Sequence, residues 1–180
     1  MIIYTGRFQP IHNGHLSLIK RLRKEYPDET LCVAVIKDIP LEAKTEFDKA
    51  VDGMLSHDRN PFNAEITLSL IYNALKAEGI DNIVVTLMPR TSCATWDIIK
   101  ALFDCERIWV FTKNQISEDD WEDKKAAFYQ SMGDKVIRIP IDKDISGSDI
   151  RILIQKRDYD KLQLYLHPST IEIIKNLREL

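Results

Sequence analysis

The chain has few of the features that mark secreted or membrane proteins. Its three cysteines, Cys32, Cys93 and Cys105, are odd in number and contain no CxxC spacing, so no simple disulfide framework is expected. A reducing compartment suits such a chain. No apolar run approaches the ~20 residues that cross a bilayer, and the N-terminus lacks a basic segment followed by a long apolar run. We therefore expect a cytoplasmic protein without a membrane anchor.

The chain also has no excess of positive charge. The net charge is -3 at pH 7 over 180 residues, and the sequence pI is about 5.8. Broad nucleic-acid binding needs a basic face, so nucleic acid is not expected as a partner. A local basic pocket for phosphate groups remains compatible with this charge. Hydrophobic residues make up 44% of the chain, which suits a single globular domain spanning 1–180.

Strand-like and helix-like patterns alternate along the chain. Short apolar runs predict strands, and helical spacing or amphipathic patterns predict the helices between them. The expected strands are 2–5, 31–36, 83–88, 107–112 and 135–139, and the expected helices follow Gly6, run from Pro61 to Gly79, and cover 94–103, 118–131 and parts of 146–180, where Pro168 opens the last one. This alternation predicts an α/β, Rossmann-like, doubly wound parallel sheet of about five strands, with helices on both faces and a C-terminal helical extension.

Two features of this plan indicate where a ligand lies. Doubly wound sheets bind ligands beyond the carboxyl ends of their strands, where the strand order reverses. The polar, irregular segment 38–60 is long for a connection in a compact domain, so we expect a substrate loop or lid there.

The segment GRFQPIHNGHL directly follows the first strand. Gly6 permits a tight turn close to a ligand, and Gly14 leaves room for a phosphate beside the backbone. His12 and His15 are three residues apart at a helix start, where unpaired N–H groups attract anions. With Arg7 they form a candidate anion site. A metal-binding His-x-x-His pair and two unrelated surface histidines are the alternatives, although no carboxylate or cysteine is nearby to complete a metal site.

The segment DISGSDIR follows the last strand. Ser146 or Ser148 can cap the next helix, and Gly147 leaves space for a phosphate between the two hydroxyl groups. Arg151 lies one helical turn further on, so its guanidinium group can point back at the same anion. Taken alone, the segment favours an ordinary serine-capped helix, because serine caps followed by an arginine are common. Its pairing with the histidine segment favours phosphate chemistry.

These segments resemble the motifs of the nucleotidylyltransferase superfamily. GRFQPIHNGH is similar to the HxGH region, and ISGSDIR is similar to the motif written ISSTxxR. The form of the first motif, together with DRNPF (58–62) and LHPSTIEIIKNL (166–177), most resembles the archaeal-type nicotinamide mononucleotide adenylyltransferases. The resemblance extends over the chain from end to end.

The resemblance implies a direct reaction, in which a substrate phosphate oxygen attacks the α-phosphorus of a nucleoside triphosphate and pyrophosphate leaves. His12, His15, Arg7 and Arg151 are the implied catalytic residues. The implied contacts to the nucleotide are Gly6, Arg7, Phe8, Gln9, Gly14, Asn114, Ser146, Gly147, Ser148 and Arg151. Arg59 and Trp96 are implied on the acceptor side, where Trp96 either stacks on the acceptor ring or packs in the core. Mg²⁺ is the expected cofactor, with no protein ligand identified.

The acceptor side departs from the family pattern. NPF is followed by NAEIT rather than a Gly-Glu-Arg sequence, and the stretch MPRTSCATW is short and lacks an acidic residue. The resemblance nevertheless makes transfer of AMP from ATP to nicotinamide mononucleotide the first hypothesis. A homo-oligomer is compatible with the sequence. Cytidylyl transfer from CTP to a phosphorylated alcohol or sugar and a catalytically weak nucleotide-binding regulatory domain are the alternatives. A plain dinucleotide binder is disfavoured because GxGxxG is absent.

Overall fold

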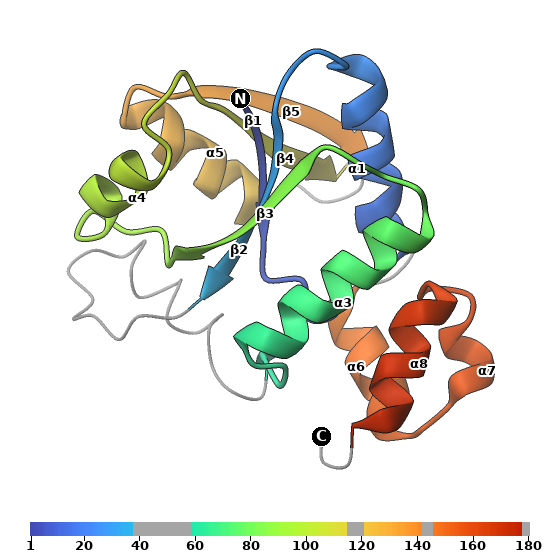
Figure 1. The fold of residues 1–180 in the computed structure, drawn as a ribbon. Coiled ribbons are helices and arrows are strands. Elements are labelled where there is room, and N and C mark those ends of the chain that lie inside the picture. The colour runs from blue at the N-terminus through green and yellow to red at the C-terminus, as the bar shows by residue number, and fades with distance from the viewer. Residues whose placement is uncertain (38–58, 115–120, 142–145, 178–180) are drawn as a thin grey trace.

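Strands and helices alternate through the computed structural model, which describes residues 1–37, 59–114, 121–141 and 146–177 (Figure 1). The strands are β1 (Ile2–Gly6), β2 (Leu31–Lys37), β3 (Ile83–Pro89), β4 (Ile108–Asn114) and β5 (Lys135–Ile141). The helices are α1 (Asn13–Glu25), α3 (Ala64–Ala77), α4 (Trp96–Leu102), α5 (Trp121–Ser131), α6 (Gly147–Gln155), α7 (Tyr159–Leu162) and α8 (Pro168–Asn176). The predicted lid segment 38–60 lies almost wholly outside the described residues.

The sheet is parallel, in the order β3-β2-β1-β4-β5. The chain moves outward from β1 through β2 to β3, then returns to place β4 on the other side of β1. The strand order therefore reverses between β1 and β4, which is where ligands bind in such sheets. The predicted α/β fold, with about five parallel strands, is confirmed.

The two faces of the sheet carry separate cores because side chains alternate along each strand. Ile2 and Tyr4 pack with helices α1, α3, α6 and α8 on one face, whereas Ile3 points to the other face. There it joins α4 and α5 in a cluster rich in aromatic residues. Figure 1 shows α1 and α3 separated from α4 and α5 by the sheet.

The start of α3 differs from the prediction. The helix begins at Ala64 rather than at Pro61, because the Asn63 side chain caps it by accepting a hydrogen bond from Ile66 N at 2.9 Å. The capping bond satisfies one of the unpaired N–H groups at the helix start. Pro168, in contrast, does occupy the first turn of α8 as expected. The helix expected over 118–131 is described from Trp121 onward.

The C-terminal helices are joined to the start of α1. Asn13 N donates to Tyr165 O at 2.8 Å, and the Asn13 side chain donates to Leu164 O at 3.3 Å. These bonds fix the first turn of α1 against a segment about 150 residues away in sequence. Within the described ranges, no helix is both long and apolar enough to cross a bilayer.

Candidate functional site

A cleft of about 700 Å³ opens beyond the carboxyl ends of β1 and β4. Its walls come from the β1–α1 turn, the first turns of α1 and α5, the start of α6 and the segment before α8. Residues from both sequence motifs line it, among them Gly6, Arg7, Phe8, Gln9, His12, Gly14, His15, Gly147 and Arg151. The cleft thus lies where the strand order reverses, and the fold brings the two motifs to one place.

Phe8 packs against the ring of His15. Its backbone has a positive φ of 50°, which is unusual for a bulky residue. Its ring is 2% exposed and meets the His15 ring edge-on at a centroid distance of 5.0 Å. A Cβ on Gly6 would lie 3.2 Å from the Phe8 ring, so a larger residue at position 6 would press on the ring where it folds back over the turn. Phe8 was expected to contact nucleotide; in the structure it lines the cleft, and its ring packs against the ring of His15.

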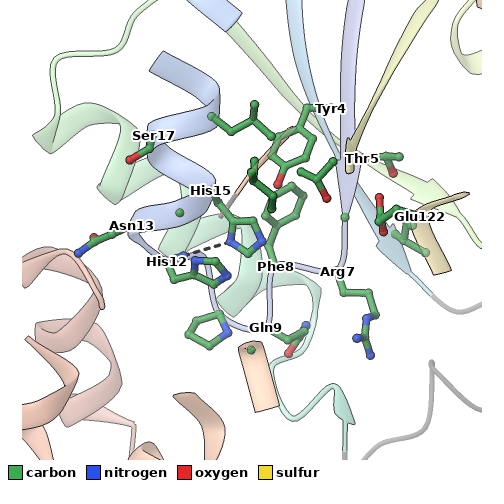
Figure 2. Close-up of a pocket in the computed structure, with 18 of the residues that line it drawn as sticks. Tyr4, Thr5, Arg7, Phe8, Gln9, His12, Asn13, His15, Ser17 and Glu122 are labelled. Atoms are coloured by element: carbon green, nitrogen blue, oxygen red, sulfur yellow. Dashed lines mark hydrogen bonds between the residues drawn. The ribbon is translucent and has the colours of Figure 1, made fainter. Parts of the chain in front are cut away.

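His12 and His15 lie side by side at the start of α1 (Figure 2). Their ring centroids are 3.6 Å apart with the planes at 30°. The backbone N–H of His12 donates to His15 Nδ1 at 3.2 Å. Because Nδ1 accepts a hydrogen bond, the proton of the neutral imidazole ring lies on Nε2. This leaves an N–H donor on the other side of the ring. Together with the N–H groups of the helix start, this donor can stabilise a phosphate oxygen.

Three guanidinium groups from three segments approach the same region. Burial lowers the pKa of Arg151, and the positive charge of Arg59 lowers it further. Burial likewise lowers the pKa of Arg7, to which the charges of Arg151 and Arg59 add, whereas the Glu122 carboxylate acts in the opposite sense. The cations therefore repel one another across the cleft. An anion bound among them would relieve this repulsion.

The two serines at the start of α6, both predicted to contact phosphate, have different partners in the structure. The Ser146 hydroxyl donates to the Asp149 carboxylate at 2.6 Å, and Asp149 N donates back to Ser146 Oγ at 3.3 Å. Ser146 is thus engaged in capping the helix. Ser148 instead accepts from Arg151 Nη2 at 2.9 Å. Gly147 lies between them on the cleft wall, with Arg151 Nη1 3.4 Å from where its Cβ would be.

Gln9 lines the cleft, but its amide is bonded to protein groups. Its Nε2 donates to Phe62 O at 2.9 Å, and its Oε1 accepts from Phe62 N at 2.9 Å. The residue is only 5% exposed. The prediction placed Gln9 among the nucleotide contacts; in the structure its side chain ties the histidine turn to the segment that precedes α3.

Trp96 lies away from the cleft. It is 3% exposed and packs against Trp109 and Tyr129, with ring centroids 6.5 and 5.1 Å away. This position agrees with the core-packing alternative for Trp96 rather than with stacking on an acceptor ring. Arg59 is exposed, on the segment before α3, and Asn114 is the last residue of β4, at the edge of the sheet where the cleft opens.

The start of α5 contributes cleft residues that the sequence prediction missed. Trp121, Glu122 and Lys125 line the cleft, and Lys125 forms an ion pair with Glu122. Lys125 also lies 5.2 Å from the centroid of the Phe111 ring. The available signal was positional, because the helix after β4 begins beside the point where the strand order reverses. Trp121 is therefore the tryptophan on the cleft wall.

Comparisons with known proteins agree with this geometry. The family model described as Cytidylyltransferase-like matches residues 3–152. The chain is 26% identical over 187 residues to a nicotinamide-nucleotide adenylyltransferase of Thermococcus sibiricus, a match that covers 98% of this chain and 83% of the relative.

Solved structures share the fold. A Vibrio parahaemolyticus structure, provisionally assigned as a nicotinate-nucleotide adenylyltransferase, superposes with a TM-score of 0.61 at 17% identity, covering 97% of both chains. The nicotinic acid mononucleotide adenylyltransferase of Plasmodium falciparum, complexed with NaAD, gives a TM-score of 0.52 at 18% identity, covering 97% of this chain and 93% of that one. At these identities the likeness concerns the fold.

Proposed function

The chain belongs to the cytidylyltransferase-like family of nucleotidylyltransferases, and from this premise we propose that it transfers the adenylyl group of ATP to nicotinamide mononucleotide. The observation that carries the proposal is the cleft itself, which is lined by the two adjoining histidines, by Arg7 and by Arg151, while the charge of Arg59 is near enough to act on both of these arginines. The relative from Thermococcus sibiricus supports the choice of acceptor. The altered NAEIT and MPRTSCATW stretches are the reason to test other acceptors beside it.

The chemistry needs no enzyme nucleophile. An oxygen of the acceptor phosphate forms a bond to the α-phosphorus of ATP, and the bond from that phosphorus to the bridging oxygen breaks, so that pyrophosphate leaves with the electron pair. The protein positions the two phosphates and stabilises the negative charge that develops. His15 Nε2–H donates to a non-bridging oxygen of the α-phosphate, with His12 beside it. Arg151, Arg7 and Arg59 hold the β- and γ-phosphates and stabilise the leaving pyrophosphate.

Mg²⁺ would enter this site as a companion of the triphosphate. The described residues contain no group of three histidine, cysteine or acidic side chains that could hold a metal ion. We therefore propose that phosphate oxygens and water provide much of its coordination. When bound, Mg²⁺ neutralises charge on the leaving pyrophosphate.

Pyrophosphate release tests the proposal. Purified protein with Mg²⁺ is supplied with ATP or CTP, each combined with nicotinamide mononucleotide, its nicotinate analogue, or a phosphorylated alcohol. Release with ATP and nicotinamide mononucleotide supports the proposal. Release with CTP alone moves the assignment to cytidylyl transfer, and no release with any pair, despite nucleotide binding, favours a regulatory domain.

A histidine variant tests the mechanism. His15→Ala removes one donor to the transition state, so kcat should fall by roughly 10²–10³. His167→Ala is the matched control, because His167 caps α8 outside the main cleft, where its Nδ1 accepts from Ser169 N at 3.2 Å. The control should lose stability but keep kcat. Equal kcat values for the two variants contradict the role of His15.

A further inference from the structure

Gln9 connects the histidine turn, which lines the cleft, to the segment that precedes α3. Its side-chain amide forms a reciprocal pair of hydrogen bonds with the backbone of Phe62, each 2.9 Å long. The same Nε2 lies 3.1 Å from Thr67 Oγ1, in the first turn of α3. Gln9 is 5% exposed and Phe62 is 1% exposed, so these bonds are sheltered from competing water. The pair thus joins the histidine turn to the start of α3.

The backbone of Gln9 makes the third connection. Its carbonyl oxygen accepts a hydrogen bond from Arg151 Nη1 at 3.1 Å, across 142 residues of sequence. Lys37, at the end of β2, also holds the segment before α3, because its Nζ donates to Phe62 O at 3.0 Å. One residue therefore bonds to α6 through its main chain and to the segment before α3 through its side chain.

These connections matter because of what the three segments carry. Arg7 lies two residues before Gln9, Arg59 lies three residues before Phe62, and Arg151 is itself bonded to Gln9. Burial lowers the pKa of Arg7 and Arg151, and the repulsion among the three positive charges lowers it further. Repulsion favours separation of the segments before any anion has bound. The hydrogen bonds of Gln9 oppose that separation.

We propose that Gln9 is a positioning residue that holds the Arg59 segment beside Arg7 and Arg151, so that the cluster is assembled before the polyphosphate arrives. The inference rests on the proposed function, in which this cluster binds the pyrophosphate part of the triphosphate. Preassembly lowers the ordering cost of binding, so its loss should weaken affinity for the anion. Gln9 itself need not touch the substrate.

The test uses inorganic pyrophosphate as the probe, measured by calorimetry on the full chain. Gln9→Met keeps an unbranched side chain of similar size but removes both hydrogen bonds to Phe62. The dissociation constant for pyrophosphate should rise about tenfold, because a segment freed by roughly half an ångström loses part of its aligned contacts. Steady-state KM for the triphosphate should rise with it, while the thermal midpoint falls by a few degrees.

The matched control separates positioning from stability. Asn63→Ala removes the cap of the same helix, one residue beyond Phe62, and leaves the bonds of Gln9 intact. It should lower the thermal midpoint comparably but leave pyrophosphate affinity unchanged. Equal affinities for Gln9→Met and Asn63→Ala, both folded, overturn the proposal.

A second variant covers the case in which Gln9→Met does not fold. Thr67→Val keeps the side-chain shape but removes the hydroxyl group that lies next to Gln9 Nε2 and donates to Asn63 O at 2.7 Å. A two- to threefold weaker pyrophosphate affinity in this variant supports the proposal, and an unchanged affinity overturns it. Wild-type protein that binds pyrophosphate in this Gln9-dependent manner yet transfers no adenylyl group contradicts the proposed function alone. Wild-type protein that does not bind pyrophosphate contradicts both.

Discussion

Gly14→Ala should change stability and activity in opposite directions. Gly14 is the second residue of α1, is exposed, and has no positive φ. Alanine is the better helix former by up to about 1 kcal/mol in a helix interior, and by less near an end. We therefore expect a gain in the free energy of unfolding of about 0.5 kcal/mol. For a chain of this size such a gain raises the thermal midpoint by roughly 1–2 °C.

The cost of this substitution falls on His12. A Cβ at position 14 would lie 3.1 Å from His12 Cε1 and Nδ1, which is closer than side chains normally approach. The His12 ring must then yield by a few tenths of an ångström, and it is already stacked on the His15 ring at 3.6 Å. A misplacement of 1 Å in catalytic geometry costs about 10²-fold in rate. A displacement of this smaller size should lower kcat by roughly three- to tenfold.

Thermal unfolding and pyrophosphate release on the same preparations measure the two effects. Ser69→Ala is the control, since Ser69 is an exposed helical residue of α3 away from the cleft and should gain stability without losing rate. A double-mutant cycle sharpens the test, because Gly14→Ala should cost nothing further once His12→Ala has removed the ring. Additive losses of rate in the double variant, or an unchanged kcat in Gly14→Ala, would refute the steric argument.

Three further predictions concern Trp96, Cys32 and Asp134, which do not line the cleft. Trp96→Leu should lower the free energy of unfolding by about 2 kcal/mol in a denaturant titration, because the ring is buried. Steady-state kinetics should show a KM for the acceptor within twofold of wild type. A large rise in KM would instead support stacking of Trp96 on the acceptor ring. Burial raises the pKa of Cys32 to about 12, with a smaller effect from Cys105, so iodoacetamide at pH 8 should label the two exposed cysteines of the native protein and spare Cys32, as mass spectrometry can count. Asp134 accepts two hydrogen bonds from Arg107 and one from an indole N–H, which outweigh its burial and lower its pKa. Asp134→Asn should therefore cost about 2–3 kcal/mol at neutral pH, and the difference from wild type should vanish as the pH falls from about 4 through the lowered pKa, where the native carboxylate becomes protonated.

The strands and helices of the fold could be predicted from local patterns in the sequence. Apolar runs of strand length alternate with segments of helical spacing, and such periodicities depend only on neighbouring residues. Parallel pairing of the strands is then expected, because a helix connects each strand to the next, and the cleft is expected beyond the carboxyl ends of the strands. The boundary error at α3 shows the limit of this reasoning, since Pro61 is a valid start signal but the bond from Ile66 N to Asn63 defines the start in the structure.

The histidine turn was predictable for a similar reason. Gly6, His12, Gly14 and His15 lie within ten residues, so their spacing places them on one turn and one helix face before any tertiary contact is known. Three-dimensional structure added the hydrogen bond that assigns the proton of His15 to Nε2. It also added the support of the Phe8 ring beneath that histidine.

The sequence by itself determined that the chain forms a parallel sheet with helices, which family it belongs to, and where the two motifs lie. Each of these depends on residues that are close together in the chain. Only the tertiary structure decided which aromatic and polar groups face the cleft. Trp96 is buried in the core whereas Trp121 lies on the cleft wall, although both begin helices that follow strands. Gln9 bonds to Phe62 and to Arg151, partners 53 and 142 residues away. Such choices depend on how whole elements pack, and no local spacing encodes the distance between them.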